Sequence, residues 1–150
     1  MTHNEIKLVP FEAWHMDALE NTDAVDGFSK GVVTDKNATR LLETQDCWTL
    51  FDNGGEVIAC GGFLKQWERR YIGWMFVTQR SSKYMIRLTR ILKIFIPDVK
   101  GRIDITVRAD FKEGHRWAKM LGFEIENKPG ILKQYGPEGE DHIAYVRINK

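Results

Sequence analysis

The stretch Tyr71–Val77, with the sequence YIGWMFV, is apolar at almost every position. A strand with one face in solvent would alternate apolar and polar residues, so this run predicts a central strand covered on both faces. After the polar residues 78–82, apolar side chains recur at helical spacing from Met85 to Phe95, and Pro97 ends the pattern. The sequence therefore predicts a buried strand followed by a long amphipathic helix.

The segment after this helix completes a crossover unit. In Ile103–Val107, apolar residues alternate with polar ones, as in a strand with one buried face. Because a helix of suitable length separates the two strands, Ile103–Val107 is predicted to run parallel to Tyr71–Val77. A second helix is predicted to begin at Asp110, which forms a capping box with Glu113. It ends at Gly122, where glycine adopts the left-handed C-cap conformation cheaply.

The rest of the chain extends this unit into a sheet. Cys47–Phe51 and Val57–Leu64 flank the turn Asp52–Gly55, whose Asn and Gly residues are typical of an antiparallel hairpin. The other predicted elements are strands at Ile6–Val9, Phe123–Ile125 and Ile143–Ile148, helices at Phe11–Leu19 and Asp35–Glu43, and a substrate-facing loop at Asn21–Val33. The fold class predicted is α/β, with a central mixed β-sheet, helices on both faces, and residues 1–150 as one domain.

The amino-acid composition limits the classes of protein to which this chain can belong. The 150 residues are 43% hydrophobic and 29% charged, with 22 Lys and Arg against 21 Asp and Glu, which is typical of a folded globular chain. No apolar run approaches the roughly 20 residues that span a bilayer, and no N-terminal signal pattern is present. Cys47 and Cys60 form no CxxC, and the histidines make no pair at zinc-ligand spacing. We expect a cytoplasmic protein with no membrane segment and no structural metal.

The predicted elements and their motifs resemble those of a known protein family. The order of the elements, together with a central apolar strand, a helix, a strand and a helix ending in Leu121-Gly122-Phe123, resembles the GNAT superfamily of acetyltransferases. The resemblance covers most of the chain and is sharpest in Tyr71–Phe95 and Arg102–Phe123. It implies a GNAT-like fold, acetyl-CoA as the cofactor, and acyl transfer to a small-molecule or protein amine.

The resemblance also implies where the cofactor lies. In this family acetyl-CoA occupies the gap where the central strand and its parallel neighbour splay apart, and backbone N–H groups of the first strand hold the thioester carbonyl. Phe76 and Val77 are the matching residues. A glycine-containing turn at the start of the next helix cradles the pyrophosphate, because that helix end has unpaired donors and a positive dipole.

This turn departs from the family pattern of Gln or Arg, two residues, Gly, one residue, then Gly or Ala. The first glycine position falls on Ser82 or Lys83, according to the register, and neither register contains a glycine. Arg80, Ser81, Ser82 and Lys83 offer cationic and hydroxyl contacts to a phosphate instead. The alternative is that the two serines cap the helix while the basic residues form a solvated face.

The position of the family's general acid is also altered. That acid is often a Tyr on the last helix, and counting back from Gly122 the position falls on Ala118. Tyr84 is the candidate substitute, with Tyr135 and His115 as further options. A lone Tyr or His near an apolar helix is, however, more often a packed residue than an acid.

Glu68 is the candidate general base, by analogy with carboxylates that precede the central strand in the family. The alternative is an ordinary hairpin charge beside Arg69 and Arg70.

Residues 79–102 carry seven Lys or Arg and one Asp, a net charge of +6 in a chain that is otherwise nearly neutral. This segment could hold the phosphates of CoA or contact an acidic protein surface. Nucleic acid ranks last, because aromatic residues for base stacking are sparse.

The Trp-x-x-Val-Thr strand, the turn without glycine and the basic helix resemble GNAT-like proteins of short-tailed bacteriophages, among which are both acetyltransferases and internal virion proteins. Two hypotheses follow: an acetyl-CoA-dependent N-acyltransferase with weak or lost activity, and a non-catalytic binding or virion-assembly protein.

Overall fold

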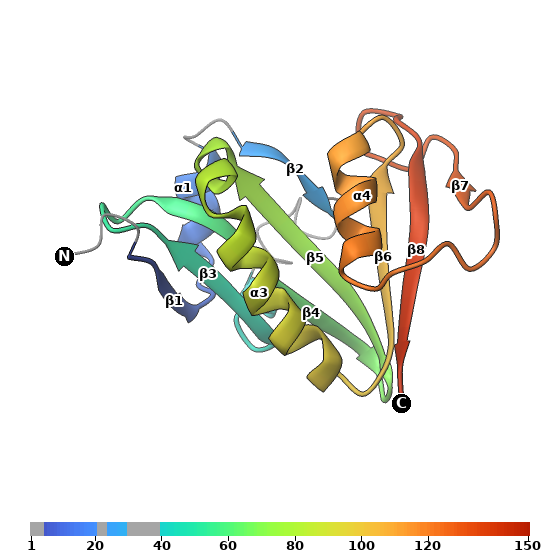
Figure 1. Ribbon diagram of the computed structural model, residues 1–150, viewed down its shortest axis with the longest axis horizontal. Helices are drawn as coiled ribbons and strands as arrows, with labels where there is room; N and C mark the ends of the chain where they lie inside the picture. Colours follow the sequence, from blue (N-terminus) through green and yellow to red (C-terminus); the bar gives the residue numbers. More distant parts are fainter. Residues whose placement is uncertain (1–4, 21–23, 30–39) are drawn as a thin grey trace.

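The computed structural model describes residues 5–20, 24–29 and 40–150, which form a mixed β-sheet with helices on both faces (Figure 1). The strand order is β1-β3-β4-β5-β6-β8-β7, and β2 pairs with β5 outside this order. The elements are β1 (Lys7–Pro10), α1 (Trp14–Glu20), β2 (Ala24–Phe28), β3 (Asp46–Phe51), β4 (Val57–Trp67), β5 (Arg70–Thr78), the 3-10 turn η2 (Gln79–Lys83), α3 (Met85–Phe95), the 3-10 turn η3 (Ile96–Asp98), β6 (Gly101–Arg108), α4 (Lys112–Met120), β7 (Ile131–Leu132) and β8 (His142–Asn149). The predicted fold class is confirmed.

Strand β5 lies in the middle of the sheet, as its apolar sequence predicts. Residues 73–78 are buried, with β4 paired antiparallel along one side. On the other side β6 runs parallel to β5, in a register that pairs Arg70 with Arg102 and Ile72 with Asp104. The predicted parallel crossover through α3 is therefore confirmed.

The predicted hairpin between β3 and β4 is also confirmed. The side-chain Oδ1 of Asp52 accepts hydrogen bonds from the backbone N–H groups of Gly54 (2.8 Å) and Glu56 (3.0 Å). Gly55 has a φ of +83°, a conformation that side chains with a Cβ rarely adopt. Local side-chain and backbone chemistry thus sets this turn.

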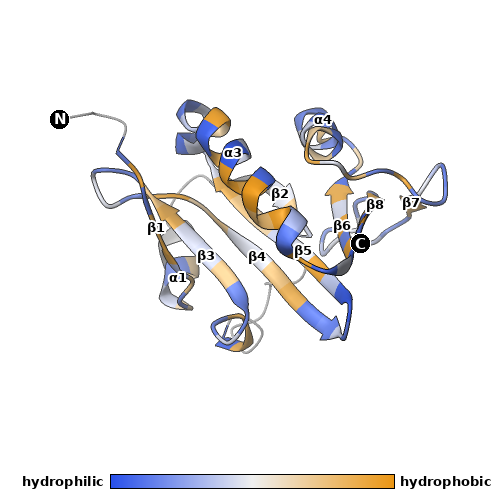
Figure 2. Cartoon of the chain, turned by 60° about the horizontal axis from the view of Figure 1, so that its bottom comes forward, coloured by the Kyte–Doolittle hydropathy of each residue, from blue (hydrophilic) through white to orange (hydrophobic). Residues whose placement is uncertain are grey.

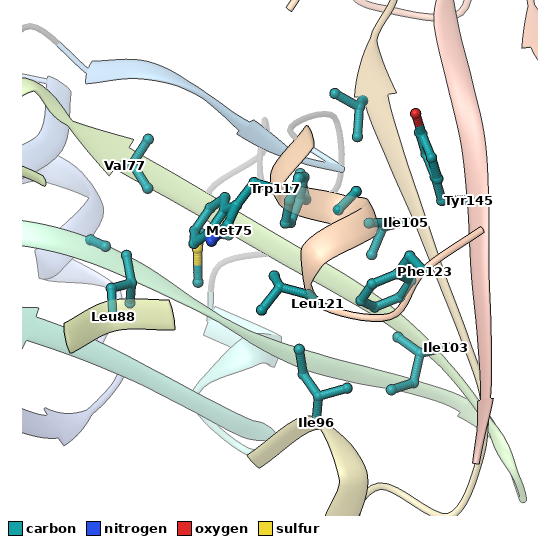
Figure 3. Packing of buried hydrophobic residues seen from close by; sticks show 14 of the residues in the cluster. Met75, Val77, Leu88, Ile96, Ile103, Ile105, Trp117, Leu121, Phe123 and Tyr145 are labelled. Atoms are coloured by element: carbon teal, nitrogen blue, oxygen red, sulfur yellow. The ribbon is translucent and has the colours of Figure 1, made fainter. Parts of the chain in front are cut away.

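The core beneath α3 and α4 is built on the alternation in β6. Ile103, Ile105 and Val107 are almost completely buried. Figure 3 shows Ile103 and Ile105 beside Leu121 and Phe123. Helix α4 lies so close to β6 that a Cβ atom at Gly114 would come within 2.9 Å of the Val107 side chain. The indole N–H of Trp117 donates a 2.9 Å hydrogen bond to Thr89, which ties α4 to α3.

Helix α4 ends as predicted at Gly122, which has a φ of +88°. The N–H of Gly122 donates to the carbonyl of Lys119, and the N–H of Phe123 donates to that of Ala118. This pair of bonds is a Schellman motif, and it satisfies two carbonyls that the helix end leaves unpaired.

On the opposite face, a second core surrounds α1. His15 is 1% exposed, and its Nδ1 accepts a 3.0 Å hydrogen bond from the backbone N–H of Glu12 and lies 2.7 Å from the hydroxyl oxygen of Thr49. Because the N–H can only donate, Nδ1 is an acceptor and the Thr49 hydroxyl donates to it as well. Burial lowers the pKa of His15, so the imidazole is held neutral.

The two cysteines belong to this second core. Both are free and buried, and the indole N–H of Trp74 lies 3.3 Å from the sulfur of Cys47. Burial raises the pKa of the Cys47 thiol to about 11 and raises that of Cys60 further. Both therefore stay protonated near neutral pH and act as small apolar side chains.

Several predicted elements need correction. Within the predicted loop Asn21–Val33, Ala24–Phe28 forms strand β2, and residues 21–23 and 30–33 lie outside the described part of the chain. The predicted strand Phe123–Ile125 makes only one isolated bridge, from Glu124 to Val146. Of the predicted helix Asp35–Glu43, residues 40–42 are helical and residues 35–39 lie outside the described part of the chain.

The predicted capping box at the start of α4 is also wrong. The carboxylate of Asp110 pairs with Arg108 at 2.6 Å, and the N-cap position is Phe111, without a side-chain cap. The nearby guanidinium therefore takes the carboxylate that a cap would need.

Candidate active site

The central feature of the candidate site is a gap between β5 and β6. The two strands are paired from Arg70 and Arg102 as far as Ile72 and Asp104, and beyond this point they diverge toward their carboxyl ends (Figure 1). A parallel pair that separates in this way leaves backbone N–H and C=O groups on its inner edges without sheet partners. This is the gap in which the sequence resemblance places a cofactor.

Strand β2 lies along the β5 side of this gap. It pairs antiparallel with β5, with Ala24 opposite Thr78 and Val25 opposite Val77. Val77 consequently has strand neighbours on both sides, since Ala59 of β4 lies opposite it on the other edge. The backbone of Gly27 packs against β5 so closely that a Cβ atom there would lie 3.2 Å from the Cα of Phe76.

This arrangement corrects one expectation from the sequence. Phe76 and Val77 were expected to present an open strand edge to the cofactor, and β2 covers that edge. Ser29, the residue after β2, reaches β6, and its N–H donates a 2.9 Å hydrogen bond to the carbonyl of Thr106. The N–H of Thr106 donates back to the Ser29 hydroxyl at 3.1 Å.

The expected phosphate turn is the 3-10 turn η2. Ser81 is buried, and its carbonyl accepts a hydrogen bond from the N–H of Tyr84. The exposed hydroxyl of Ser82 donates to the carbonyl of Gln79 at 3.1 Å. The N-cap of α3 is Tyr84, with no side-chain cap, so the alternative reading of these serines as caps of α3 is wrong.

The two basic residues of this turn differ in their surroundings. Arg80 is 53% exposed and pairs at 3.1 Å with Asp52, the carboxylate that also organises the β3–β4 turn. Lys83 is exposed at the start of α3. Of the residues expected to contact phosphate, Arg80, Ser82 and Lys83 therefore have accessible polar groups, whereas Ser81 is buried.

Tyr84 and His115 lie in packed surroundings, whereas the third candidate acid, Tyr135, is 56% exposed. Tyr84 is 7% exposed and belongs to the core beneath α3. His115 has both ring nitrogens engaged, one 2.8 Å from the hydroxyl of Tyr145 and the other 3.0 Å from the carbonyl of Ala109. Ala118, at the family's Tyr position, is fully buried in the same core.

Glu68 does not lie in the gap. It sits in the β4–β5 hairpin just before the end of β5 that pairs with β6, whereas the turn η2 follows Thr78, which is roughly 26 Å from Arg70 along β5 at about 3.3 Å per residue. Its carboxylate is 82% exposed and pairs at 2.9 Å with Lys65. The hydrogen bond and charge of Lys65 lower the pKa of Glu68, whereas a general base near neutral pH needs a raised pKa.

A pocket of about 320 Å³ lies where β5 and β6 begin to diverge, and sequence reasoning missed most of it. Its polar lining comes from Ser29, Asp104, Thr106, Arg70 and the hydroxyl-bearing Tyr135, one of the alternative acids. The alternation in β6 contained a signal, because polar residues between buried ones must share the face opposite α3 and α4.

The carboxylate of Asp104 is already neutralised. It pairs with Arg70 at 3.0 Å and with Arg102 at 2.9 Å. Arg102 also pairs with Glu126 at 2.8 Å, and its hydrogen bonds with Glu126 and Asp104 raise the pKa of Arg102. The four charges balance, so this network fixes β5, β6 and the segment after α4 without a surplus charge.

The described residues contain neither a cluster of metal ligands nor a helix that could span a membrane. No group of three His, Cys, Asp or Glu side chains that could hold a metal ion occurs among the described residues. Within the same residues, no helix has the length and apolar character to cross a membrane.

Several solved structures with a similar arrangement of elements are acetyltransferases. A GNAT-family acetyltransferase from Streptococcus pneumoniae is 14% identical with a TM-score of 0.65, over 97% of this chain and 100% of that one. The fold is that of the GNAT acetyltransferases. The ribosomal-protein-S18-alanine N-acetyltransferase of Escherichia coli has the GNAT-like arrangement too, at 14% identity and a TM-score of 0.63, over 97% and 96% of the two chains.

A third GNAT-like structure, a spermidine N-acetyltransferase chimera that is partly from Vibrio cholerae, is 11% identical with a TM-score of 0.63, over 95% of each chain. No protein-family model and no curated protein matches the sequence. The likeness at these identities establishes the GNAT fold, and function has to be argued from the site.

Proposed function

We propose that this chain is a GNAT-fold, acetyl-CoA-dependent N-acetyltransferase-like protein whose activity is weak. The observation that carries the proposal is the divergence of β5 from β6 beyond Ile72 and Asp104, next to the basic turn η2. A sheet gap beside cationic side chains suits an extended ligand with phosphates at one end. The solved acetyltransferases of the same fold support this reading.

Acetyl-CoA does not fit the gap in the described conformation. Strand β2 lies on the edge of β5, and the Gly27 backbone leaves no room for another chain beside Met75 and Phe76. If the cofactor binds, Arg80 and Lys83 are the residues that would contact its phosphates. When bound, it would supply the activated acetyl group.

Three features support weak turnover. Ala118 supplies no acid where the family often has one, and the Glu68 carboxylate is exposed and paired with Lys65 rather than facing the gap as a base. Asp104 in the adjoining pocket is neutralised by two guanidinium groups, so it attracts a protonated amine only weakly. General acid or base help is typically worth about 10²- to 10⁴-fold in rate, so its loss predicts slow acetylation.

The direct test is calorimetric titration of the protein with acetyl-CoA, combined with a CoA-release assay. Acceptors to be tried are spermidine and a peptide with a free alanine amine, because spermidine and ribosomal protein S18 alanine are named for two proteins of this fold. Saturable binding with slow release of CoA is expected. Absence of saturable binding would refute the proposal.

A second function is favoured by the exposed side of α3. Ile86 and Ile94 are 72% and 64% exposed, and Arg90 and Lys93 are exposed and fall between them in the sequence. Figure 2 shows hydrophobic and hydrophilic residues interspersed along α3. Helix α3 contains no acidic residue. A surface that is both apolar and basic complements an acidic protein surface with apolar residues, whereas a nucleic-acid backbone offers the isoleucines nothing.

In this second reading the chain is a non-catalytic binding protein, and its resemblance to phage-encoded proteins suggests virion assembly as the process. The probe is a synthetic amphipathic helix carrying Glu and Leu on one face. The variant Ile86→Ser with Ile94→Ser should weaken its binding while leaving binding of polyglutamate unchanged. Tighter binding to duplex DNA than to the peptide would contradict a protein partner.

A further inference from the structure

Residues 24–29, here called the strap, bridge the gap between β5 and β6. At one end the strap pairs with Val77 and Thr78 of β5, and at the other Ser29 exchanges two hydrogen bonds with Thr106 of β6. The strap therefore supplies backbone partners to both strands where they no longer pair with each other (Figure 1).

One apolar side chain anchors the strap. Phe28 is 4% exposed, and its ring lies 5.1 Å from that of Trp117 on α4. Removing this large apolar side chain from water favours the docked strap. The strap is thus docked as a defined strand.

Other features weaken the docking. The pairing with β5 shifts register between Val25 and Phe28, so the ladder is interrupted after its first two pairs. Ser29 has a φ of +51°, a left-handed conformation that is costly for a residue with a Cβ. Only the absence of a side chain at Gly27 lets the interrupted segment approach Met75.

We propose that the strap is removable and competes with the extended, amide-bearing arm of acetyl-CoA for the edge of β5. This inference rests on the proposed function and explains why the gap is closed in a chain of this fold. Both occupants satisfy the same backbone groups of β5, so they exclude each other. The protein with the strap docked is the closed, inactive form.

The competition predicts by how much the docked strap weakens the affinity for acetyl-CoA. The apparent dissociation constant equals the intrinsic one divided by the fraction of molecules with the strap undocked. A strap that is docked in nine molecules out of ten therefore weakens binding about tenfold. Undocking the strap by mutation should recover that factor.

The test uses Gly27→Ala, whose Cβ atom would overlap the backbone of Met75 and prevent docking. The matched control is Gly54→Ala in an exposed turn, where the added Cβ meets only the Asp52 carboxylate at 3.4 Å. Acetyl-CoA affinity is measured by calorimetry for the parent and both variants. Strap docking is followed separately, by hydrogen exchange at the backbone amide of Ser29, which is bonded to Thr106.

We expect Gly27→Ala to expose the Ser29 amide and to bind acetyl-CoA at least about tenfold more tightly, with Gly54→Ala unchanged. Saturating acetyl-CoA should also expose that amide in the parent. If the parent and Gly27→Ala bind acetyl-CoA equally and the Ser29 amide stays protected in the parent complex, the proposed competition is wrong. The proposed function would be unaffected by that result. Exposure of the amide in Gly27→Ala without binding to either protein would overturn both.

A milder variant guards against misfolding of Gly27→Ala. Ser29→Ala removes only the hydroxyl that accepts the hydrogen bond from Thr106. It should give a smaller gain in affinity with a matching loss of protection at residue 29. A gain in affinity without loss of protection would contradict the competition.

Discussion

Replacing Ala118 by Tyr would place the family's usual acid at its usual position, and the structure predicts that this damages the fold. Ala118 is fully buried in the core between α4 and the sheet. One turn earlier, even a Cβ atom at Gly114 would come within 2.9 Å of Val107. Two small residues a turn apart therefore set the distance between α4 and β6, and a phenol ring cannot enter without moving the helix.

The cost has two parts. Overpacking a core typically costs about 1–3 kcal/mol. Burying a hydroxyl without a partner adds a further cost of about 1–3 kcal/mol. Ala118→Tyr should then lose about 2–6 kcal/mol of the roughly 5–15 kcal/mol that stabilise a domain. The assay is guanidinium unfolding followed by tryptophan fluorescence.

The matched control is Lys119→Tyr, which adds the same side chain at the next, exposed position of α4. It should change the free energy of unfolding by no more than about 0.5 kcal/mol. A variant Ala118→Tyr as stable as the parent would refute the close packing of α4. Faster CoA release by that variant would show in addition that position 118 reaches the reacting groups.

Three further predictions concern pH and the candidate site residues. The pKa of His15 lies below its usual 6.5 in the folded protein, so the unfolded chain takes up this proton first and stability falls as the pH drops below 6.5. The slope from this group is at most about 1.4 kcal/mol per pH unit, and His15→Asn should remove it in unfolding measured between about pH 5 and 8. Joint replacement of Arg80 and Lys83 by Ala should weaken acetyl-CoA binding, each lost charge-assisted contact being worth about 1.5–3 kcal/mol, and unchanged affinity would place the phosphates elsewhere. Glu68→Gln should leave CoA release unchanged because its carboxylate is exposed and paired with Lys65, whereas abolished release would restore Glu68 as the base.

Much of the fold could be predicted because its pattern is local. The apolar run of β5, the alternation in β6 and the glycine that ends α4 each determine their own element. Strand β2 could not be predicted in this way. Its sequence AVDGF carries turn residues and lacks strand periodicity, and it becomes a strand because the divergence of β5 from β6 leaves an edge for it to pair with.

In the candidate site, too, the features set by neighbouring residues could be predicted and those set by tertiary structure could not. Arg80, Ser82 and Lys83 are close in sequence, and their common place in one turn could be predicted. The contact of Ser29 with Thr106 joins residues far apart in the chain and depends on tertiary structure alone. Glu68 is a candidate by analogy alone, and analogy does not show that its carboxylate is exposed and paired with Lys65.

The strap is explained by the backbone groups that the diverging strands leave unpaired, and this explanation limits what its presence says about function. Two parallel strands that diverge leave backbone groups beside an apolar core, and those groups need either a ligand or another part of the chain. A docked strap is therefore expected in a cofactor-free form, whether the chain binds acetyl-CoA or not. What separates the two hypotheses is its docking free energy. At about 1.4 kcal/mol the strap costs tenfold in affinity and acts as a gate, and at about 5.5 kcal/mol it costs about 10⁴-fold and converts an intrinsic micromolar site into one that is empty at ordinary cofactor concentrations. Exchange at the Ser29 amide measures this quantity in the protein alone, before any substrate has been found.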